Sequence, residues 1–409
     1  MKRRPLLPEP TTPMRQVEFI ALTAMLFASV AFSIDAMLPA LPRIAADISP
    51  DAPNRAQLII TSFVLGMGLG TLLTGPLSDA FGRKPIVLWG AVLYCIGAAL
   101  ALMANTVETM FAARMLQGLG AAGPRVVAVA IIRDQYSGRQ MARLMSFIML
   151  VFTIVPAIAP TMGAGIIWLA GWHAVFFSFI LFSVISALWF KLRQPETLPP
   201  ENRRPLRWEP LRQGLREILT HRVVLLTLLT QALVFGAFFA TLSSTQQIFD
   251  QTFGQGANFH LWFGLVAVAA SPASLINAKL VERVGMRNMI TVVLLIQIGL
   301  TGIAALLFWS AVLPQAVMFW VYLAWNIGMF MQTGLTGGNL NALAMEPMGH
   351  LAGLTASVTG AVGTIGAVAL AIPLGLAFDG TPLPLMVGSW VLIVLGFAAM
   401  LVLRATDRR

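Results

Sequence analysis

Charged residues are scarce in this sequence. Asp, Glu, Lys and Arg together make up only 11% of the 409 positions, whereas a soluble protein carries roughly 25%. The mean hydropathy is +0.80. A surface with so little charge faces lipid rather than water, so the composition excludes a soluble globular protein.

Long stretches lack charge altogether. A helix needs about 20 apolar residues to cross the hydrocarbon core of a bilayer. Two of the charge-free stretches are each long enough for two such helices joined by a turn. The stretches are Leu144 to Phe190, Asn288 to Met345, Pro347 to Phe378 and Gly380 to Leu403.

The residues that enzymes and metal sites require are also missing. The single cysteine, Cys95, excludes an intrachain disulfide. The four histidines are dispersed near predicted loop ends and form no metal-binding cluster. No phosphate-binding GxxxxGK[ST] loop and no nucleophile constellation occur. We therefore expect no enzyme, no ATP drive, no metal and no cofactor.

The basic residues that remain are unevenly placed. The net charge of +10 could indicate nucleic acid, but twelve helices would put every basic cluster on the side of the N-terminus. Positive loops stay cytoplasmic, so the pattern predicts a membrane protein with both termini in the cytoplasm and no nucleic-acid partner. The clusters are Lys2 to Arg15, Arg83 and Lys84, Arg133 to Arg143, Lys191 to Arg222, Lys279 to Arg287, and Arg404 to Arg409.

Hydropathy predicts twelve membrane helices in two halves. A basic, proline-containing segment at 191–221 separates a first bundle, 1–190, from a second, 222–409. The predicted spans are 17–41, 56–78, 85–104, 109–132, 141–169 and 174–191, followed by 222–249, 259–281, 288–308, 313–344, 352–377 and 384–403.

The two halves also resemble each other. The segment GPLSDAFGRK, Gly75 to Lys84, follows the second span, and AKLVERVGMR, Ala278 to Arg287, follows the eighth at an offset of 203 residues. The acids Asp79 and Glu282 and the glycines Gly82 and Gly285 fall in register. Parallel six-helix repeats with a binding site between them are a transporter architecture.

The first of these segments carries a motif. Gly75 permits close helix approach and Gly82 a tight turn. Asp79 can pair with a base or cap a helix at its membrane edge. Ordinary turn chemistry is the alternative interpretation. The spacing resembles the loop between helices two and three of the major facilitator superfamily. The resemblance implies a cytoplasmic latch that favours the outward-facing state, formed by Gly75, Asp79, Gly82, Arg83 and Lys84.

A second motif, Arg114-Met-Leu-Gln117-Gly118, lies in the fourth span. An intramembrane arginine costs roughly 2.5–3.5 kcal/mol on insertion scales and usually faces a cavity or partner. The motif resembles the fourth helix of proton-coupled members of the superfamily, which links Arg114 to proton transfer. The alternative is an arginine that extends to the membrane interface. Arg125 follows three turns later on the same face, as a cavity-lining cation or as the partner of a structural acid.

Asp35 is the acid that we place inside the membrane, in the first span. Burial disfavours a charged carboxylate and a nearby arginine favours it. A cavity that opens alternately on two sides could change that balance, so we predict that Asp35 and Arg114 couple transport to protons. The alternative is a structural Asp35 at the outer interface.

The fifth span predicts a bend, because prolines remove helical hydrogen bonds and glycines let neighbours pack closely. Its residues are Pro156, Pro160, Gly163 and Gly165. It resembles the superfamily's antiporter motif incompletely, since Val155, Ala159 and Ala164 stand where glycines occur. Flexible and aromatic residues suited to a drug pocket are Phe63, Met149, Phe152, Phe238, Phe239 and Met331, together with Arg125.

Within the superfamily the chain is most similar to the bicyclomycin-resistance-type (Bcr/CflA) drug:proton antiporters. The resemblance implies a monomeric, multi-pass secondary transporter of the bacterial inner membrane that exports small hydrophobic compounds in exchange for protons by alternating access. One alternative is uptake or export of a single metabolite by the same fold, and another is a non-transporting receptor. The matching segments are Asp35 to Pro42, Arg133-Asp134, Ala159 to Gly163, Gly171-Trp172, Pro195 to Leu198 and Gly285 to Arg287.

Overall fold

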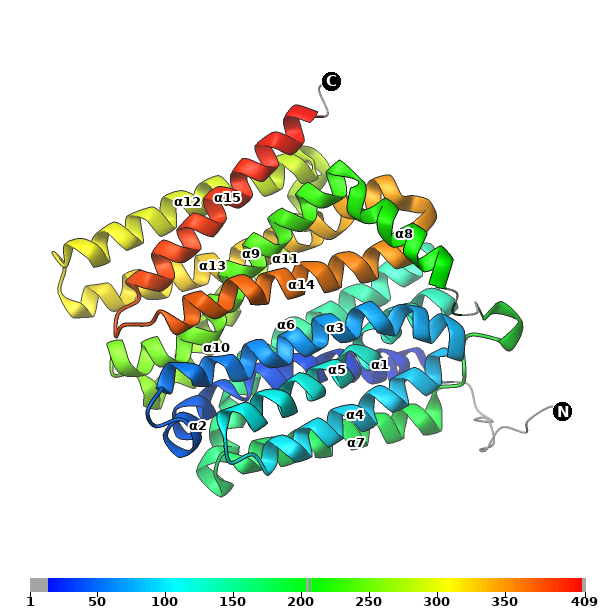
Figure 1. Ribbon diagram of the computed structural model, residues 1–409, viewed down its shortest axis with the longest axis horizontal. Coiled ribbons are helices and arrows are strands. Elements are labelled where there is room, and N and C mark those ends of the chain that lie inside the picture. Colours follow the sequence, from blue (N-terminus) through cyan, green and yellow to red (C-terminus); the bar gives the residue numbers. More distant parts are fainter. Residues whose placement is uncertain (1–13, 204–205, 207, 407–409) are drawn as a thin grey trace.

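The computed structural model describes residues 14–203, 206 and 208–406, and these residues form helices joined by short turns (Figure 1). The long helices of the first half are α1 Gln16–Asp35, α3 Leu58–Phe81, α4 Arg83–Leu102, α5 Val107–Gln135, α6 Gly138–Ala170 and α7 His173–Arg193. Those of the second half are α9 Arg222–Gln247, α10 Phe259–Ala270 with α11 Pro272–Val284, α12 Met286–Ser310, α13 Gln315–Met345, α14 Ala352–Leu376 and α15 Leu383–Thr406.

Ten helical segments of the described chain are long and apolar enough to cross a membrane. The helices α6 and α13 occupy the other two positions of the twelve that the sequence predicts. α6 contributes a shorter apolar stretch, Ile154–Ala170. α13 is less apolar because it carries buried polar side chains such as Asn326, Gln332 and Asn339.

Two predicted spans are broken rather than continuous. The first ends as α1 at Asp35 and continues through the 3-10 turn η1, Leu38–Ala40, into the short helix α2, Leu41–Ile48. The eighth is divided into α10 and α11 at Ser271, next to Pro272. Proline cannot donate a helical hydrogen bond, which explains the second break from the sequence.

The central helices differ from the peripheral ones in burial. The most apolar window of α5 is 67% buried and that of the segment from α1 to α2 is 72% buried, against 33% for α4 and for α7. Exposed apolar side chains such as Trp89, Leu100 and Leu188 lie on these peripheral helices. α4 and α7 therefore face lipid, and α1 and α5 face protein.

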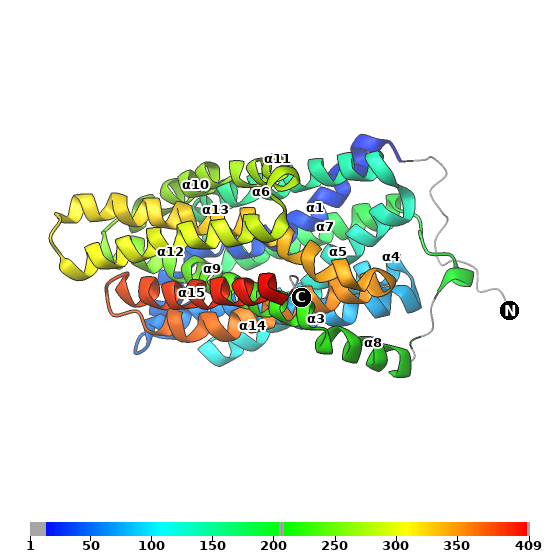
Figure 2. The ribbon, with the colours of Figure 1, turned by 90° about the horizontal axis from the view of Figure 1, so that it is seen from above.

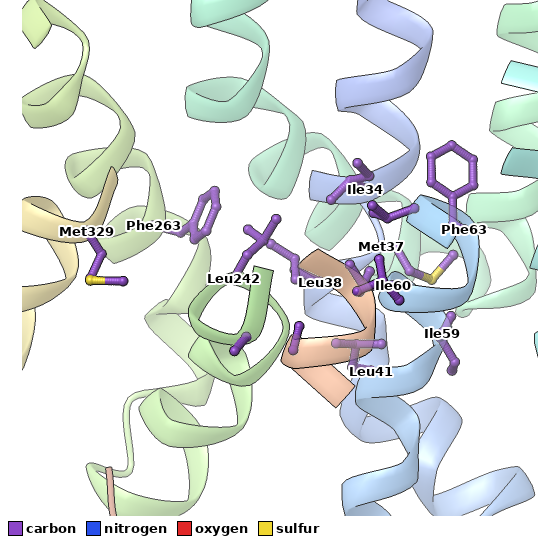
Figure 3. Close-up of a cluster of buried hydrophobic side chains, with 14 of the residues drawn as sticks. Ile34, Met37, Leu38, Leu41, Ile59, Ile60, Phe63, Leu242, Phe263 and Met329 are labelled. Atoms are coloured by element: carbon purple, nitrogen blue, oxygen red, sulfur yellow. The ribbon is translucent and has the colours of Figure 1, made fainter. Parts of the chain in front are cut away.

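The two halves meet along two pairs of helices. α3 packs against α14, and α6 packs against α10 (Figures 1 and 2). Apolar residues of both halves join in one cluster, in which Leu38 of η1 lies near Leu242 of α9 (Figure 3). The contacts of α3 with α14 run from Gly75 beside Ser357 to Gln57 beside Gly375, which lies at the ends of the helices away from the chain termini. We call this the distal side, and the side with both termini the terminus side.

The segment between the halves, treated as a loop from the sequence, contains a further helix, α8, Trp208–Thr220. Its spacing explains the helix, because Leu211, Leu215 and Ile218 recur on one face. Ile218 is buried in a small cluster with Val358 of α14 and Leu72 of α3. Pro210 is tolerated because it falls in the first turn.

Candidate functional site

The site is built around Arg114, whose side chain is 0% exposed. Its Nε donates to the Ile59 carbonyl of α3 at 3.2 Å and its Nη2 to the Ser33 carbonyl of α1 at 3.0 Å. Its Nη1 donates to Gln117 Oε1 at 2.7 Å, and the guanidinium lies 4.4 Å from the centre of the Phe63 ring. Arg114 therefore joins three helices through neutral acceptors, which excludes an arginine that extends to the membrane interface.

Glycines allow these helices to approach so closely. A Cβ at Gly118 would overlap the carbonyl of Phe63, and a Cβ at Gly66 would overlap that of Met115. Close packing of α3 on α5 places the Ile59 carbonyl within reach of Arg114. The predicted motif residues Gln117 and Gly118 thus both position Arg114. Gln117 accepts a hydrogen bond from Arg114, and Gly118 allows α3 to pack closely against α5.

Asp35 lies at the break in the first span. It is the last residue of α1, and its side chain is 5% exposed. Among the described residues its carboxylate accepts no hydrogen bond and forms no ion pair. Arg114 binds the carbonyl of Ser33, two residues earlier. The structure therefore places Asp35 and Arg114 in one neighbourhood without a direct contact, and the proton-coupling role of the pair stays a prediction.

The hydroxyls of Ser33 and Tyr94 hydrogen-bond to each other, so α4 also contributes to this neighbourhood. Non-helical backbone inside a membrane needs protein partners for its polar groups. Here the close contacts of α4, α5 and α6 surround the break.

The fifth-span residues divide by their contacts. Pro156 and Pro160 lie inside α6. A Cβ at Gly163 would overlap the carbonyl of Ala36, the residue after Asp35, whereas a Cβ at Gly165 would meet nothing within 4 Å. Gly163 therefore admits the broken end of α1, and Gly165 has no such contact in this structure.

The predicted latch forms a charged cluster on the terminus side. Arg83 is only 4% exposed. Its Nε donates to Asp134 Oδ2 at 3.0 Å, and its Nη1 donates to Asp79 Oδ1 at 2.5 Å and to Ser78 Oγ at 2.8 Å. Sequence reasoning gave no role to Asp134, although it follows the fourth span in a segment that matches the related transporters.

Glu196 completes this cluster. Its carboxylate accepts from the backbone N–H groups of Arg83 at 2.9 Å and Lys84 at 3.0 Å, which caps the N-terminus of α4. Gly82 provides the turn with φ = 104°, and Gly285 repeats it in the second half with φ = 81°. A Cβ at Gly75 would contact Ser357 of α14, so the motif touches the other half at this glycine.

The residues proposed for a drug pocket do not gather in one place. Phe63 is fully buried beneath Arg114. Phe238 packs against Phe330 at 5.0 Å and against Phe239 at 5.4 Å, ring centre to ring centre. Met331 is partly buried in α13. The side chains of Met149 and Phe152 lie outside the described part of the structure.

Amide side chains close the distal side, which sequence reasoning missed. Gln57 Nε2 donates to Gln247 Oε1 at 2.6 Å, and Ser244 Oγ donates to Gln57 Oε1 at 2.8 Å. Gln247 Nε2 donates to Asn54 Oδ1 at 2.6 Å, and Asn54 Nδ2 donates to the Phe378 carbonyl at 2.8 Å. We call Asn54, Gln57, Ser244 and Gln247 the amide clasp. It joins the start of the second span to α9 and to the end of α14.

A cavity of about 170 Å³ lies beside the amide clasp. Apolar residues of α2 such as Leu41 and Ala45 form one wall, and polar residues such as Gln246 and Asp250 form the other. Within the described residues, no group of three or more His, Cys, Asp or Glu side chains could hold a metal ion.

Comparison with known proteins identifies a family that matches most of this chain. The sequence profile described as the Major Facilitator Superfamily matches residues 22–372. A protein of Haemophilus influenzae named "Bicyclomycin resistance protein homolog" is 31% identical over 385 residues, which is 92% of this chain and 94% of that protein. "Multidrug resistance protein MdtL" of Escherichia coli is 34% identical over 199 residues, 48% of this chain and 50% of that one.

Solved structures share the fold at low sequence identity. The Escherichia coli xylose transporter XylE, in a partially occluded inward-open conformation, superimposes with a TM-score of 0.72 at 13% identity and covers 94% of this chain and 96% of its own. The nucleoside transporter NupG superimposes with a TM-score of 0.73 at 13% identity and covers 95% of this chain and 100% of its own.

Proposed function

Because this chain belongs to the major facilitator superfamily of secondary membrane transporters, we propose that it exports small apolar compounds, drugs among them, in exchange for protons. Family membership makes it a multi-pass membrane transporter rather than an enzyme, and it confirms the predicted all-α fold of twelve membrane helices. The names of the Haemophilus and Escherichia relatives support drugs as the cargo.

One observation carries the proton coupling: a buried carboxyl group without a described partner at a broken helix. Asp35 is 5% exposed and lies two residues from the carbonyl that Arg114 binds. The protonation of a carboxyl group depends on water and nearby charge. In this proposal Asp35 exchanges its proton as the two halves rock and its surroundings alternate between dry and wet, and Arg114 holds the broken end of α1 in place.

The proposed transport cycle follows from the contacts between the halves. The units that rock are the bundles 1–190 and 222–409, joined by 191–221. In this proposal the basic terminus side lies in the cytoplasm, the amide clasp faces outward, and the structure corresponds to a state closed to the outside. The Gly75 to Lys84 loop would latch the terminus side in the opposite state, and the prolines of α6 would support the bending. The residues Phe63, Phe238, Phe239, Met149, Phe152 and Met331 remain proposed substrate contacts.

The membrane potential is large enough to drive the proposed export. The membrane potential supplies about 2.3 kcal/mol per charge per 100 mV, or roughly 50-fold accumulation of a neutral drug exchanged for one proton.

The test uses inside-out vesicles with an imposed proton gradient and a pH-sensitive dye. We expect added drugs to release protons with the native protein and with Asp51→Asn, a control at an exposed acid, but not with Asp35→Asn. Drug transport without proton movement would disprove antiport. Coupling that survives in Asp35→Asn would assign the proton to another acid. A single saturable metabolite, without competition among drugs, would favour the alternative of a specific carrier.

A further inference from the structure

Arg125 is a second intramembrane arginine for which the proposed mechanism has no use. It lies in α5, eleven residues after Arg114, which is about 16 Å along the helix and on the same face. Arg114 donates to carbonyls of both α1 and α3. This face of α5 is therefore directed toward the space between those two helices. Arg125 is half-buried there, ten residues before the end of α5 on the terminus side.

Among the described residues, Arg125 meets few acceptors for its guanidinium. Its Nη1 lies 3.4 Å from the thioether sulfur of Met67, and a thioether is a weak acceptor. No acid within residues 14–203, 206 and 208–406 lies at ion-pair distance from it. A guanidinium carries five N–H donors in a fixed fork, so the described residues use only a small part of its hydrogen-bonding capacity.

The described part of the chain offers no spare acid at this depth. Asp35 is the one acid among the buried polar residues of the described chain, and it sits next to the carbonyl network of Arg114 rather than beside Arg125. The neighbouring part of α6, residues 144–170, contains no acidic residue in its sequence. A charge inside a membrane span without a partner is costly, so an arginine that meets no acid among the described residues is a candidate binding group.

We propose that Arg125 binds the anionic group, a carboxylate or a sulfonate, of a substrate whose remaining surface is apolar. This inference rests on the proposed export function and names its substrate class. A planar guanidinium recognises such an oxyanion through two parallel hydrogen bonds. The thioether of Met67, 3.4 Å from Nη1, makes the immediate surroundings of the guanidinium apolar. Arg125 is thus a specificity residue for acidic amphiphiles.

The charge of the substrate changes the energetics of export. One proton entering and one monoanion leaving move two charges in the direction that the membrane potential favours, instead of one. At 100 mV the roughly 50-fold accumulation of a neutral drug becomes roughly 2,500-fold for a monoanion. Acidic substrates should therefore be exported against the steeper gradient.

The experiment compares two probes of one shape, 2-naphthaleneacetate and its uncharged amide, in proteoliposomes with a set proton gradient and potassium potential. We expect the ratio of acid to amide transport to fall at least tenfold in Arg125→Met and to recover partly in Arg125→Lys. Arg212→Met removes a charge from the exposed surface of α8 and should keep the native ratio. Acid transport should also depend on the potential as two charges per cycle, and amide transport as one.

Each other outcome overturns the inference in a recognisable way. An unchanged ratio in Arg125→Met, or an equal loss of both probes in a protein that still elutes as a folded monodisperse species, removes Arg125 from anion recognition. If the native protein moves the amide with protons but not the acid, export stands and the anionic substrate class is wrong. If it moves neither probe and releases no protons with any drug, the proposed function itself fails.

Discussion

Arg114 and Arg125 lie on one face of one helix, yet their surroundings differ. Arg114 is fully buried and donates to two backbone carbonyls and one side-chain amide. Arg125 is half-buried and meets one thioether. The comparison shows that an intramembrane arginine is not functional by depth alone. We interpret the three hydrogen bonds of Arg114 as a link between helices, and the single thioether contact of Arg125 among the described residues as the basis of its proposed role in ligand binding.

The largest effect should come from removing each guanidinium in turn. Arg114→Met leaves three acceptors without their donor, and we expect a loss of about 3 kcal/mol in the free energy of unfolding, because each buried unsatisfied group costs roughly 1–3 kcal/mol. Arg125→Met removes a charge with no described partner, and stability should stay level or rise by about 1 kcal/mol. Unfolding of the purified proteins in mixed detergent micelles measures both values. Equal losses would mean that the hydrogen-bond partners do not distinguish the two arginines.

A second test adds one methyl group to α6 at a glycine that contacts α1 and at a nearby glycine that contacts no other helix. Gly163→Ala places a Cβ against the carbonyl of Ala36, and overpacking of this kind costs about 1–3 kcal/mol. Gly165→Ala meets nothing within 4 Å and should not destabilise the protein. We also expect Gly163→Ala to weaken proton coupling, because the displaced residue is next to Asp35. Equal behaviour of the two variants in unfolding and in the pH-dye assay would contradict the packing argument.

The fold could be predicted from the sequence because a helix that crosses lipid needs an apolar stretch of about 20 residues. Apolar stretches of the right length are visible directly, as in the charge-free run from Leu144 to Phe190. The break after Asp35 was not predicted, because the apolar pattern continues through it and proline follows only at Pro39. The helix α8 was missed because prolines and basic residues obscured its leucine spacing.

The site was predicted in its parts but not in its contacts. Arg114 was identified from its cost in a membrane, but its partners are main-chain carbonyls, which have no sequence signature. Glu196 binds backbone N–H groups from a loop more than 100 positions away along the chain. The amide clasp was overlooked because Gln and Asn side chains at helix ends look like ordinary interface residues.

A third arginine extends the comparison to charged partners. Arg83 is buried and paired with Asp134, whose side chain is 18% exposed, and with Asp79, whose side chain is 44% exposed. We expect Asp134→Asn to cost about 2 kcal/mol, as for a hydrogen bond to a charged group, and Asp79→Asn less than about 1 kcal/mol, because exposed pairs contribute little. Unfolding in 0.05 and 0.5 M salt measures both. If Asp79→Asn is the more damaging change, exposure does not rank these pairs.

The smallest effect is expected where no charge takes part. In the amide clasp, Gln57→Ala removes the hydrogen bonds to Gln247 and Ser244, which contribute about 1 kcal/mol net and therefore shift the closed-to-open ratio roughly fivefold. Thr61 lies one turn deeper on α3 and is 2% exposed. In a Cys95→Ala background, Thr61→Cys should react about fivefold faster with a membrane-impermeant maleimide added outside when Gln57→Ala is present.

Gln251→Ala is the matched control, because Gln251 only accepts from Gln247 at 3.3 Å at the rim of the clasp, and the labelling rate should change less than about twofold. Hydrogen bonds between neutral amides are screened little by salt, so the fivefold difference should persist between 0.05 and 0.5 M. A difference that disappears at high salt would mean that charges outside the clasp hold the distal side closed. The closure of the distal side would then depend on charge, whereas the hydrogen bonds of Arg114 join α1, α3 and α5 within the first half through neutral acceptors.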